Sequence, residues 1–272
     1  MQDAGASHPM AGSKYRVTVD CGTKYGSASV RIIPPNPSPA THFDIHDATF
    51  QDGKPITPQI IGFTTVETGE REVIWGSDVE DAIKSKKLKV EDTIEMWKLV
   101  LYKEHANSAT VQQVLDQLKK HNLTIVELIA LHLEHLLPAI REGLDKSTIG
   151  LLVSGMNALP MELYLSVPQM WEPPACQQMV AAASMVAHKT GIEVVKLVRE
   201  PECATALHLH DVSRQLAAGF RINDEIIVAD IGGGTGDFLR VVYETDPSNG
   251  AKVVLKSTGK SEGKLLRGVT LQ

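Results

Sequence analysis

The chain has 272 residues, a length sufficient for two small domains or one large one. Its hydrophobic content of 43% is that of a globular protein. A formal net charge of −6 at pH 7, with no basic stripe, excludes general nucleic-acid binding. The three cysteines lie far apart without CxxC spacing, which indicates reduced thiols. No apolar run reaches the roughly 18 residues of a membrane span, and the N-terminus lacks a signal peptide's apolar core. We therefore expect a cytoplasmic protein without a membrane partner.

The N-terminal region combines a polar tail with β-type patterns. Residues 1–14 are rich in small residues and are predicted to be disordered. Residues 15–33 alternate apolar and polar side chains on both sides of a Gly-Thr turn, which predicts a β-hairpin. A proline-rich loop at 34–39 ends the hairpin, and short strands are predicted at Ile60–Thr65 and Glu72–Trp75.

The next segment changes character several times. A short helix is predicted over Ser77–Ile83, with Ser77 or Asp78 as its cap. The lysine-rich segment Lys84–Lys89 is predicted to be a solvated surface, with contact to an acidic partner as the alternative. Thr93–Tyr102 fits either a strand or a helix, and the sequence leaves this open.

The middle of the chain is strongly helical. Helices are predicted over Thr110–Lys120 and Thr124–Arg141, because apolar residues recur there at helical spacing. Thr124 and Glu127 have the spacing of a capping box at the start of the second helix. Pro138 is predicted to kink this helix or to end it early.

Histidines in the helical region do not form a recognisable metal motif. His132, Glu134 and His135 share one helix but lack the HExxH spacing of a zinc protease. His208 and His210 have no cysteine ligand near them in the sequence. All four histidines are predicted to lie at a helix surface or at the edge of the core.

The second half alternates strands and helices before a run of strands. Strands are predicted at Leu163–Pro168, Val194–Val198, Ile226–Asp230, Phe238–Glu244 and Lys252–Lys256. Helices are predicted at Pro173–Lys189, which Gly191 ends, and at Pro201–Gly219.

The most informative motif covers residues 226–237. An apolar strand ends in Asp230, and three glycines, Thr235 and Asp237 follow. Glycines permit a tight turn whose converging backbone amides can bind a phosphate. The flanking carboxylates would repel a bare phosphate, so they imply a divalent cation, with Mg²⁺ as the expected ion.

A similar hairpin occurs near the N-terminus. An alternating strand leads to Asp20, a turn of Gly22, Thr23 and Lys24, and a second strand that begins at Tyr25. Two such hairpins in one chain predict a two-lobed phosphate clamp.

Five segments together resemble the nucleotide-binding domain of the heat shock protein 70 family, and more closely its divergent members in fungi and animals. In chain order they are Val19–Tyr25, Met96–Leu101, Leu165–Trp171, Arg199–Ala204 and Ala229–Asp237. The resemblance implies an α/β protein with the actin-like ATPase (ribonuclease H-like) fold. It also implies ATP or ADP with Mg²⁺ as the bound nucleotide, and client or co-chaperone proteins as partners.

The resemblance assigns roles to the metal-binding and catalytic residues. Asp20 and Asp230 would hold Mg²⁺, the former through water. Glu200 would position or deprotonate the attacking water, and Asp237 would polarise that water or support the metal. Lys98 is the candidate for the lysine that stabilises the γ-phosphate.

The resemblance also assigns the residues that contact the phosphates. Thr23 and Lys24 would lie at the β- and γ-phosphates, within the first hairpin turn. The phosphates would be wrapped by Gly22 and Tyr25 of that turn and by Gly232, Gly233, Gly234 and Thr235 of the second.

The domain organisation follows from the same resemblance. We expect a disordered N-terminus at 1–14, a nearly complete first domain at 15–220 with a helical insertion at about 103–145, and a truncated second domain at 221–272. Lys24 departs from the family, which usually has a second threonine there.

Two other functions remain open. A chain that ends at Gln272 lacks the family's adenosine-binding turn, so the alternative is a non-catalytic, truncated interaction module. A sugar or acetate kinase of the same superfamily is the third reading, but it would need an acceptor-site base for which only Glu200 is a candidate.

Overall fold

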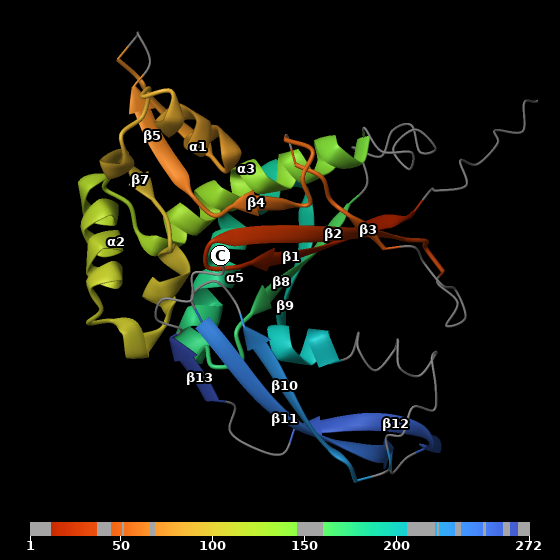
Figure 1. Ribbon diagram of the computed structural model, residues 1–272. Helices are drawn as coiled ribbons and strands as arrows, with labels where there is room; N and C mark the ends of the chain where they lie inside the picture. Colours follow the sequence, from red (N-terminus) through yellow and green to blue (C-terminus); the bar gives the residue numbers. More distant parts are fainter. Residues whose placement is uncertain are drawn as a thin grey trace, which may run out of the picture. The chain divides into compact units, whose positions relative to one another are not determined.

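The computed structural model describes residues 12–36, 45–50, 52–65, 69–145, 160–205, 221, 223–231, 235–246, 249–257 and 262–265 (Figure 1). These residues form helices together with mixed β-structure, so the protein belongs to the α/β class, as the sequence predicted. The chain divides into two compact units. The first comprises Met1–Leu165 and Ala175–Lys196, and the second comprises Ser166–Pro174 and Leu197–Gln272.

The main sheet has the strand order β3-β2-β1-β8-β9, and β4 pairs with β2 outside this order. The strands are β1 (Lys14–Cys21), β2 (Tyr25–Ile33), β3 (His46–Asp47), β4 (Ile56–Pro58), β8 (Met161–Val167) and β9 (Ile192–Arg199). The hairpin predicted at 15–33 is confirmed, because β1 runs antiparallel to β2. On its other side β1 runs parallel to β8, which makes the sheet mixed. The short strands β3 and β4 were not predicted.

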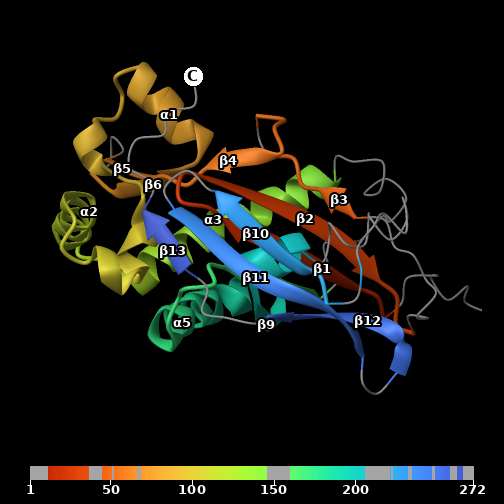
Figure 2. The same ribbon diagram turned by 60° about the horizontal axis from the view of Figure 1, so that its bottom comes forward.

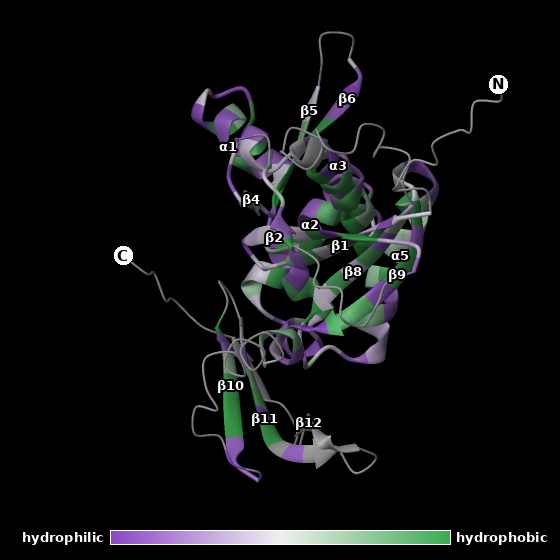
Figure 3. Ribbon diagram, turned by 90° about the vertical axis from the view of Figure 1, so that its right-hand side faces the viewer, coloured by the Kyte–Doolittle hydropathy of each residue, from purple (hydrophilic) through white to green (hydrophobic). Residues whose placement is uncertain are grey.

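Helix α3 (Ile125–Asp145) supplies much of the core of the first unit. Thr124 N donates to Glu127 Oε2 at 2.7 Å, and Glu127 N donates to Thr124 Oγ1 at 3.2 Å, so the capping box is confirmed. The prediction that Pro138 ends the helix early is wrong, since α3 continues to Asp145. Figure 3 shows the hydrophobic colouring along α3. Its fully buried apolar residues are Leu128, Ile129, Leu133, Leu136, Leu137 and Ile140.

His132 of α3 corrects a second prediction. It was expected at the helix surface or core edge, but it is completely buried. Its ring centroid lies 5.9 Å from those of both Trp75 and Trp97. These two tryptophans come from distant segments, so helical spacing alone did not reveal that this face of α3 is covered.

Helix α5 (Pro173–Thr190) agrees with its prediction at both ends. Proline is compatible with the first turn of a helix because its missing N–H has no partner there in any case. Gly191 follows with φ of +71°, the left-handed conformation that ends many helices.

A smaller sheet has the order β6-β5-β7. It consists of β5 (Ile61–Thr65), β6 (Arg71–Trp75) and β7 (Thr93–Ile94), and helix α1 (Ser77–Lys84) follows β6. Ile60, Val79 and Leu88 form its buried core, so Leu88 is an apolar anchor within the otherwise solvated lysine-rich segment. Helix α2 (Ala109–Lys120) lies beside β7 (Figure 1).

Two local predictions for this region are wrong. Gly76, with φ of +61°, caps α1 without a side-chain hydrogen bond, whereas Ser77 or Asp78 was expected. Thr93–Tyr102 is neither one strand nor one helix. Met96 adopts the left-handed conformation, with φ of +57°, between β7 and a 3₁₀ helix at Trp97–Leu101. A left-handed conformation at a single residue does not change the hydrophobic pattern, so the sequence did not indicate this break.

The second unit contains an antiparallel sheet of order β10-β11-β12, and β13 pairs with β11. Its strands are β10 (Glu225–Ile231), β11 (Thr235–Asp246), β12 (Asn249–Ser257) and β13 (Glu262–Leu265), of which β13 was not predicted. Figure 2 shows β10 and β11 side by side along their length. Residues 200–205 are helical, and the rest of the helix predicted to Gly219 lies outside the described residues.

Candidate functional site

The first hairpin brings together all of its predicted site residues on one turn. Cys21 and Gly26 are the last paired residues, so the four residues Gly22, Thr23, Lys24 and Tyr25 connect the two strands. Asp20 is exposed, one residue before the end of β1, and Thr23 is buried. A Cβ on Gly22 would lie 2.2 Å from the Tyr25 carbonyl oxygen. This turn therefore requires glycine at position 22.

Strand β4 and the residue that follows it, Gln59, form backbone contacts with this turn. Gln59 N donates to the Lys24 carbonyl oxygen at 2.8 Å, and Tyr25 pairs with Pro58. The Gln59 side chain is 1% exposed, and neither its Oε1 nor its Nε2 has a hydrogen-bond partner among the described residues. Sequence analysis missed Gln59, because its role depends on pairing between strands about 30 residues apart, which local patterns do not encode.

Lys98 is 3% exposed in the 3₁₀ helix Trp97–Leu101, between the buried residues Trp97 and Leu99. An ammonium group is stable at such a depth only when it is paired or hydrogen-bonded. The burial distinguishes Lys98 from the exposed lysines of Lys84–Lys89, although sequence analysis could separate them only through the family resemblance.

The second hairpin places two predicted carboxylates opposite each other. Asp230 on β10 pairs with Asp237 on β11, and Ile231 with Gly236 follows toward the turn. Opposed residues on antiparallel strands have neighbouring side chains, and like charges there are destabilising unless something compensates them. Asp237 is 3% exposed and lies on the same face of β11 as buried Leu239. A cation or hydrogen-bond donors must therefore compensate this pair.

The glycines of this hairpin lie outside the described residues. Gly232, Gly233 and Gly234 belong to the undescribed segment, and Thr235 is described only as the first residue of β11. The prediction that their amides wrap a phosphate therefore stays a prediction.

Glu200 is the first helical residue after β9. Ser166 Oγ at the end of β8 donates to Glu200 Oε1 at 3.4 Å. Arg199 Nη1 donates to the Pro168 carbonyl oxygen at 2.7 Å and holds the turn that follows Ser166. Sequence analysis did not single out Ser166 as a contact of Glu200, although Ser166 lies within a segment that the resemblance covers.

The cysteine beside this carboxylate is not activated. Burial raises the pKa of the Cys203 thiol, and the negative charges of Glu202 and Glu200 raise it further. A thiol with a raised pKa is a poor nucleophile, so this site gives no indication of a reactive cysteine.

The predicted residues thus form two groups. Asp20 and the first turn belong to the first unit, as does Lys98, whereas Glu200, Asp230 and Asp237 belong to the second. Among the described residues, no three His, Cys, Asp or Glu side chains gather closely enough to hold a metal ion by themselves.

Comparison with known proteins finds no matching family model and no matching curated protein. Within the described part of the chain, no single helix is long and apolar enough to cross a membrane. Helices α2 and α3 pass that test only as a pair, and the pair is bent by 81° at its break.

Proposed function

We propose that this chain binds Mg-ATP and hydrolyses it, as a chaperone-like ATPase of the heat shock protein 70 type with an actin-like fold. The proposal rests on one observation. The chain forms two hairpins, and in each of them an aspartate lies near the end of the leading strand, next to the turn. In the second hairpin a further aspartate, Asp237, lies opposite Asp230.

The residues fit Mg²⁺ better than they fit a metal that needs a closed protein cage. Mg²⁺ keeps several waters and is usually held by one or two carboxylates together with the phosphates of a substrate. Asp230 has a carboxylate neighbour in Asp237, and Asp20 presents an exposed carboxylate. When bound, Mg²⁺ would neutralise charge on the phosphate oxygens.

The chain's own residues supply the remaining steps. Backbone amides of the Gly22–Lys24 turn would donate to phosphate oxygens, and the Lys98 ammonium would stabilise charge at the γ-phosphate. Glu200, held by Ser166, would accept a proton from the attacking water. The new bond forms between that water oxygen and the γ-phosphorus, while the bond to the β–γ bridging oxygen breaks and releases ADP and phosphate.

Calorimetry with Mg-ATP tests binding, and phosphate release tests turnover. We expect Asp20→Asn and Asp230→Asn to weaken binding tenfold or more. Glu200→Gln should retain binding and lower turnover by about 10²-fold or more, because general-base catalysis contributes that much. Asp116→Asn on the exposed face of α2 is the charge-matched control.

The proposal fails if the folded protein gives no heat with millimolar Mg-ATP. It also fails if Asp116→Asn weakens binding as much as the two hairpin substitutions, because the effect would then reflect overall charge alone.

A non-catalytic interaction module is the second candidate. Ile227 and Ile231 on β10 are 73% and 65% exposed, which is unusual for large apolar side chains. Binding of a partner protein that persists in Asp20→Ala and in the absence of nucleotide would favour this reading.

A further inference from the structure

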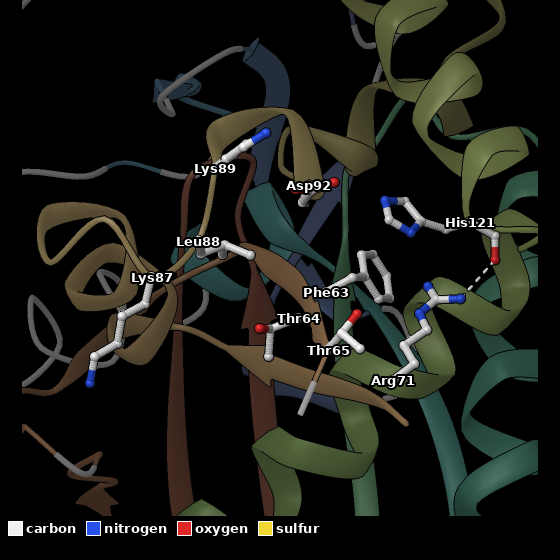
Figure 4. Close-up of a pocket in the computed structure, with 9 residues that line it drawn as sticks. All are labelled: Phe63, Thr64, Thr65, Arg71, Lys87, Leu88, Lys89, Asp92 and His121. Carbon is white, nitrogen blue, oxygen red and sulfur yellow. Dashed lines mark hydrogen bonds between the residues drawn. The ribbon is translucent and has the colours of Figure 1, made fainter. Parts of the chain in front are cut away.

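The first unit contains a pocket of 350 Å³ that includes no residue predicted for phosphate or metal binding. Strands β5 and β6, the segment after α1 and the residue after α2 line it (Figure 4). A volume of this order is typical of small-molecule sites, for which the usual range is roughly 300–1,000 Å³. The pocket is therefore large enough for a small organic ligand.

An aromatic stack holds the principal cation of the pocket in place. The Arg71 guanidinium carbon lies 4.0 Å from the centroid of the Phe63 ring, and the Phe63 and His121 rings stack with centroids 4.0 Å apart. Arg71 Nη1 also donates to the His121 carbonyl oxygen at 3.0 Å, the dashed line in Figure 4. A guanidinium has five N–H donors, so most of them remain for a ligand.

Cations outnumber anions around the pocket. The lining contains three cations, Arg71, Lys87 and Lys89, and one carboxylate, Asp92. Asp92 already pairs with Lys120 at 2.8 Å, and Lys89 pairs with Glu91 at 3.4 Å. Lys87 points away from Arg71 in Figure 4. Within the described residues Arg71 makes no ion pair with a carboxylate. The pocket thus contains an exposed and oriented cation, Arg71, that has no counter-ion among the described residues.

His121 adds a neutral polar group. Burial lowers its pKa, and the positive charges of Arg71 and Lys120 lower it further, so the imidazole is neutral at pH 7. Its Nε2 is buried and has no hydrogen-bond partner among the described residues. A neutral imidazole can donate or accept one hydrogen bond without adding to the positive charge.

We propose that this pocket binds a small organic anion, whose carboxylate or phosphate group pairs with the Arg71 guanidinium and whose apolar part contacts Phe63 and Leu88. The planar fork of arginine matches both anions in a bidentate manner. Phe63 and Leu88 are part of the lining, so an organic anion has apolar contacts available there that an inorganic one cannot use. This site is independent of the proposed nucleotide hairpins.

The test uses benzoate and phenyl phosphate as anionic probes and benzamide as a neutral analogue of similar shape. The readout is the NMR signal of the His121 ring, identified by its loss in His121→Asn, so binding elsewhere is not counted. We expect saturable shifts at millimolar anion and at least tenfold weaker binding of benzamide. The anion that binds more tightly identifies the preferred head group.

Three variants distinguish specific anion binding at Arg71 from an effect of the protein's net charge. Arg71→Gln should weaken anion binding tenfold or more, because a hydrogen bond to a charged group is lost. Arg71→Lys, which keeps the charge but loses the fork, should be intermediate. Lys84→Gln removes one charge from α1 outside the pocket and should change binding less than twofold.

The proposal is overturned if neither anion shifts the His121 signal, or if benzamide binds as tightly as benzoate. It is also overturned if Lys84→Gln weakens binding as much as Arg71→Gln while both variants keep the thermal stability of the parent protein.

Discussion

At the residue scale, Gly22 is a position of the first hairpin where the backbone itself leaves no room for a side chain. We expect Gly22→Ala to lower the free energy of unfolding by about 1–3 kcal/mol, the usual cost of overpacking. The reason is the 2.2 Å approach of the added Cβ to the Tyr25 carbonyl oxygen, which belongs to the backbone and cannot rotate away. Denaturant unfolding measures the loss.

Gly53→Ala is the control for this substitution. No atom lies within 4 Å of a Cβ at Gly53, whose φ is +74°, so only backbone strain of about 1 kcal/mol is expected there. Equal losses at both positions would contradict the explanation by close approach.

His132 is the residue whose burial has the clearest consequence for pH. Burial, together with the positive charge of His135, lowers its pKa to about 3. In the unfolded chain the imidazole pKa is about 6.5. Between these two values the unfolded state binds a proton and the native state does not. The contribution of His132 to the free energy of unfolding is therefore at its full value above pH 6.5 and decreases as the pH falls toward 3.

The pH profile of unfolding tests this linkage. From pH 7 to pH 5 we expect a loss on the order of 2 kcal/mol that is attributable to His132. His132→Leu should flatten that part of the profile, whereas His188→Gln on the exposed face of α5 should leave it unchanged. An unchanged slope in His132→Leu would show that other groups cause the acid sensitivity.

At the element scale, Pro138 weakens α3. Proline has no N–H to donate to the carbonyl four residues earlier, and Pro138 is exposed. We expect Pro138→Ala to raise the free energy of unfolding by up to about 3 kcal/mol, measured by denaturant titration. Gln113→Ala on the exposed face of α2 should change it by less than about 0.5 kcal/mol. A less stable Pro138→Ala would contradict the explanation by the missing N–H.

The elements that the sequence predicted are those with local signals. The hairpin strands alternate over a few residues, and the Thr124–Glu127 capping box marks the start of α3 within one turn. The missed strands β3, β4 and β13 are two to four residues long and exist through pairing with distant strands. The conformation of Met96 is likewise set by its surroundings, because αL backbone is unfavourable for a methionine by itself.

At the scale of the whole molecule, the proposed binding of Mg-ATP would stabilise the folded chain relative to the unfolded chain. At a hundredfold excess over its Kd, Mg-ATP should raise the free energy of unfolding by about 2.7 kcal/mol. Hydrogen exchange should slow in β1–β2 and in β10–β11, and Asp230→Asn should abolish both effects. Unchanged exchange in both hairpins at saturating Mg-ATP would contradict the proposed function.

The sequence by itself determined the α/β class, the two aspartate-bearing hairpins and the helical middle of the chain, because alternation, turns and caps act between near neighbours. Only the tertiary structure decided which polar residues are enclosed. Gln59 lies against the first turn through β4, His132 lies between Trp75 and Trp97, and Arg71 contacts a carbonyl 50 residues away. These relations arise when distant segments pack together, and burial then changes the pKa, the hydrogen bonding and the accessibility of each group.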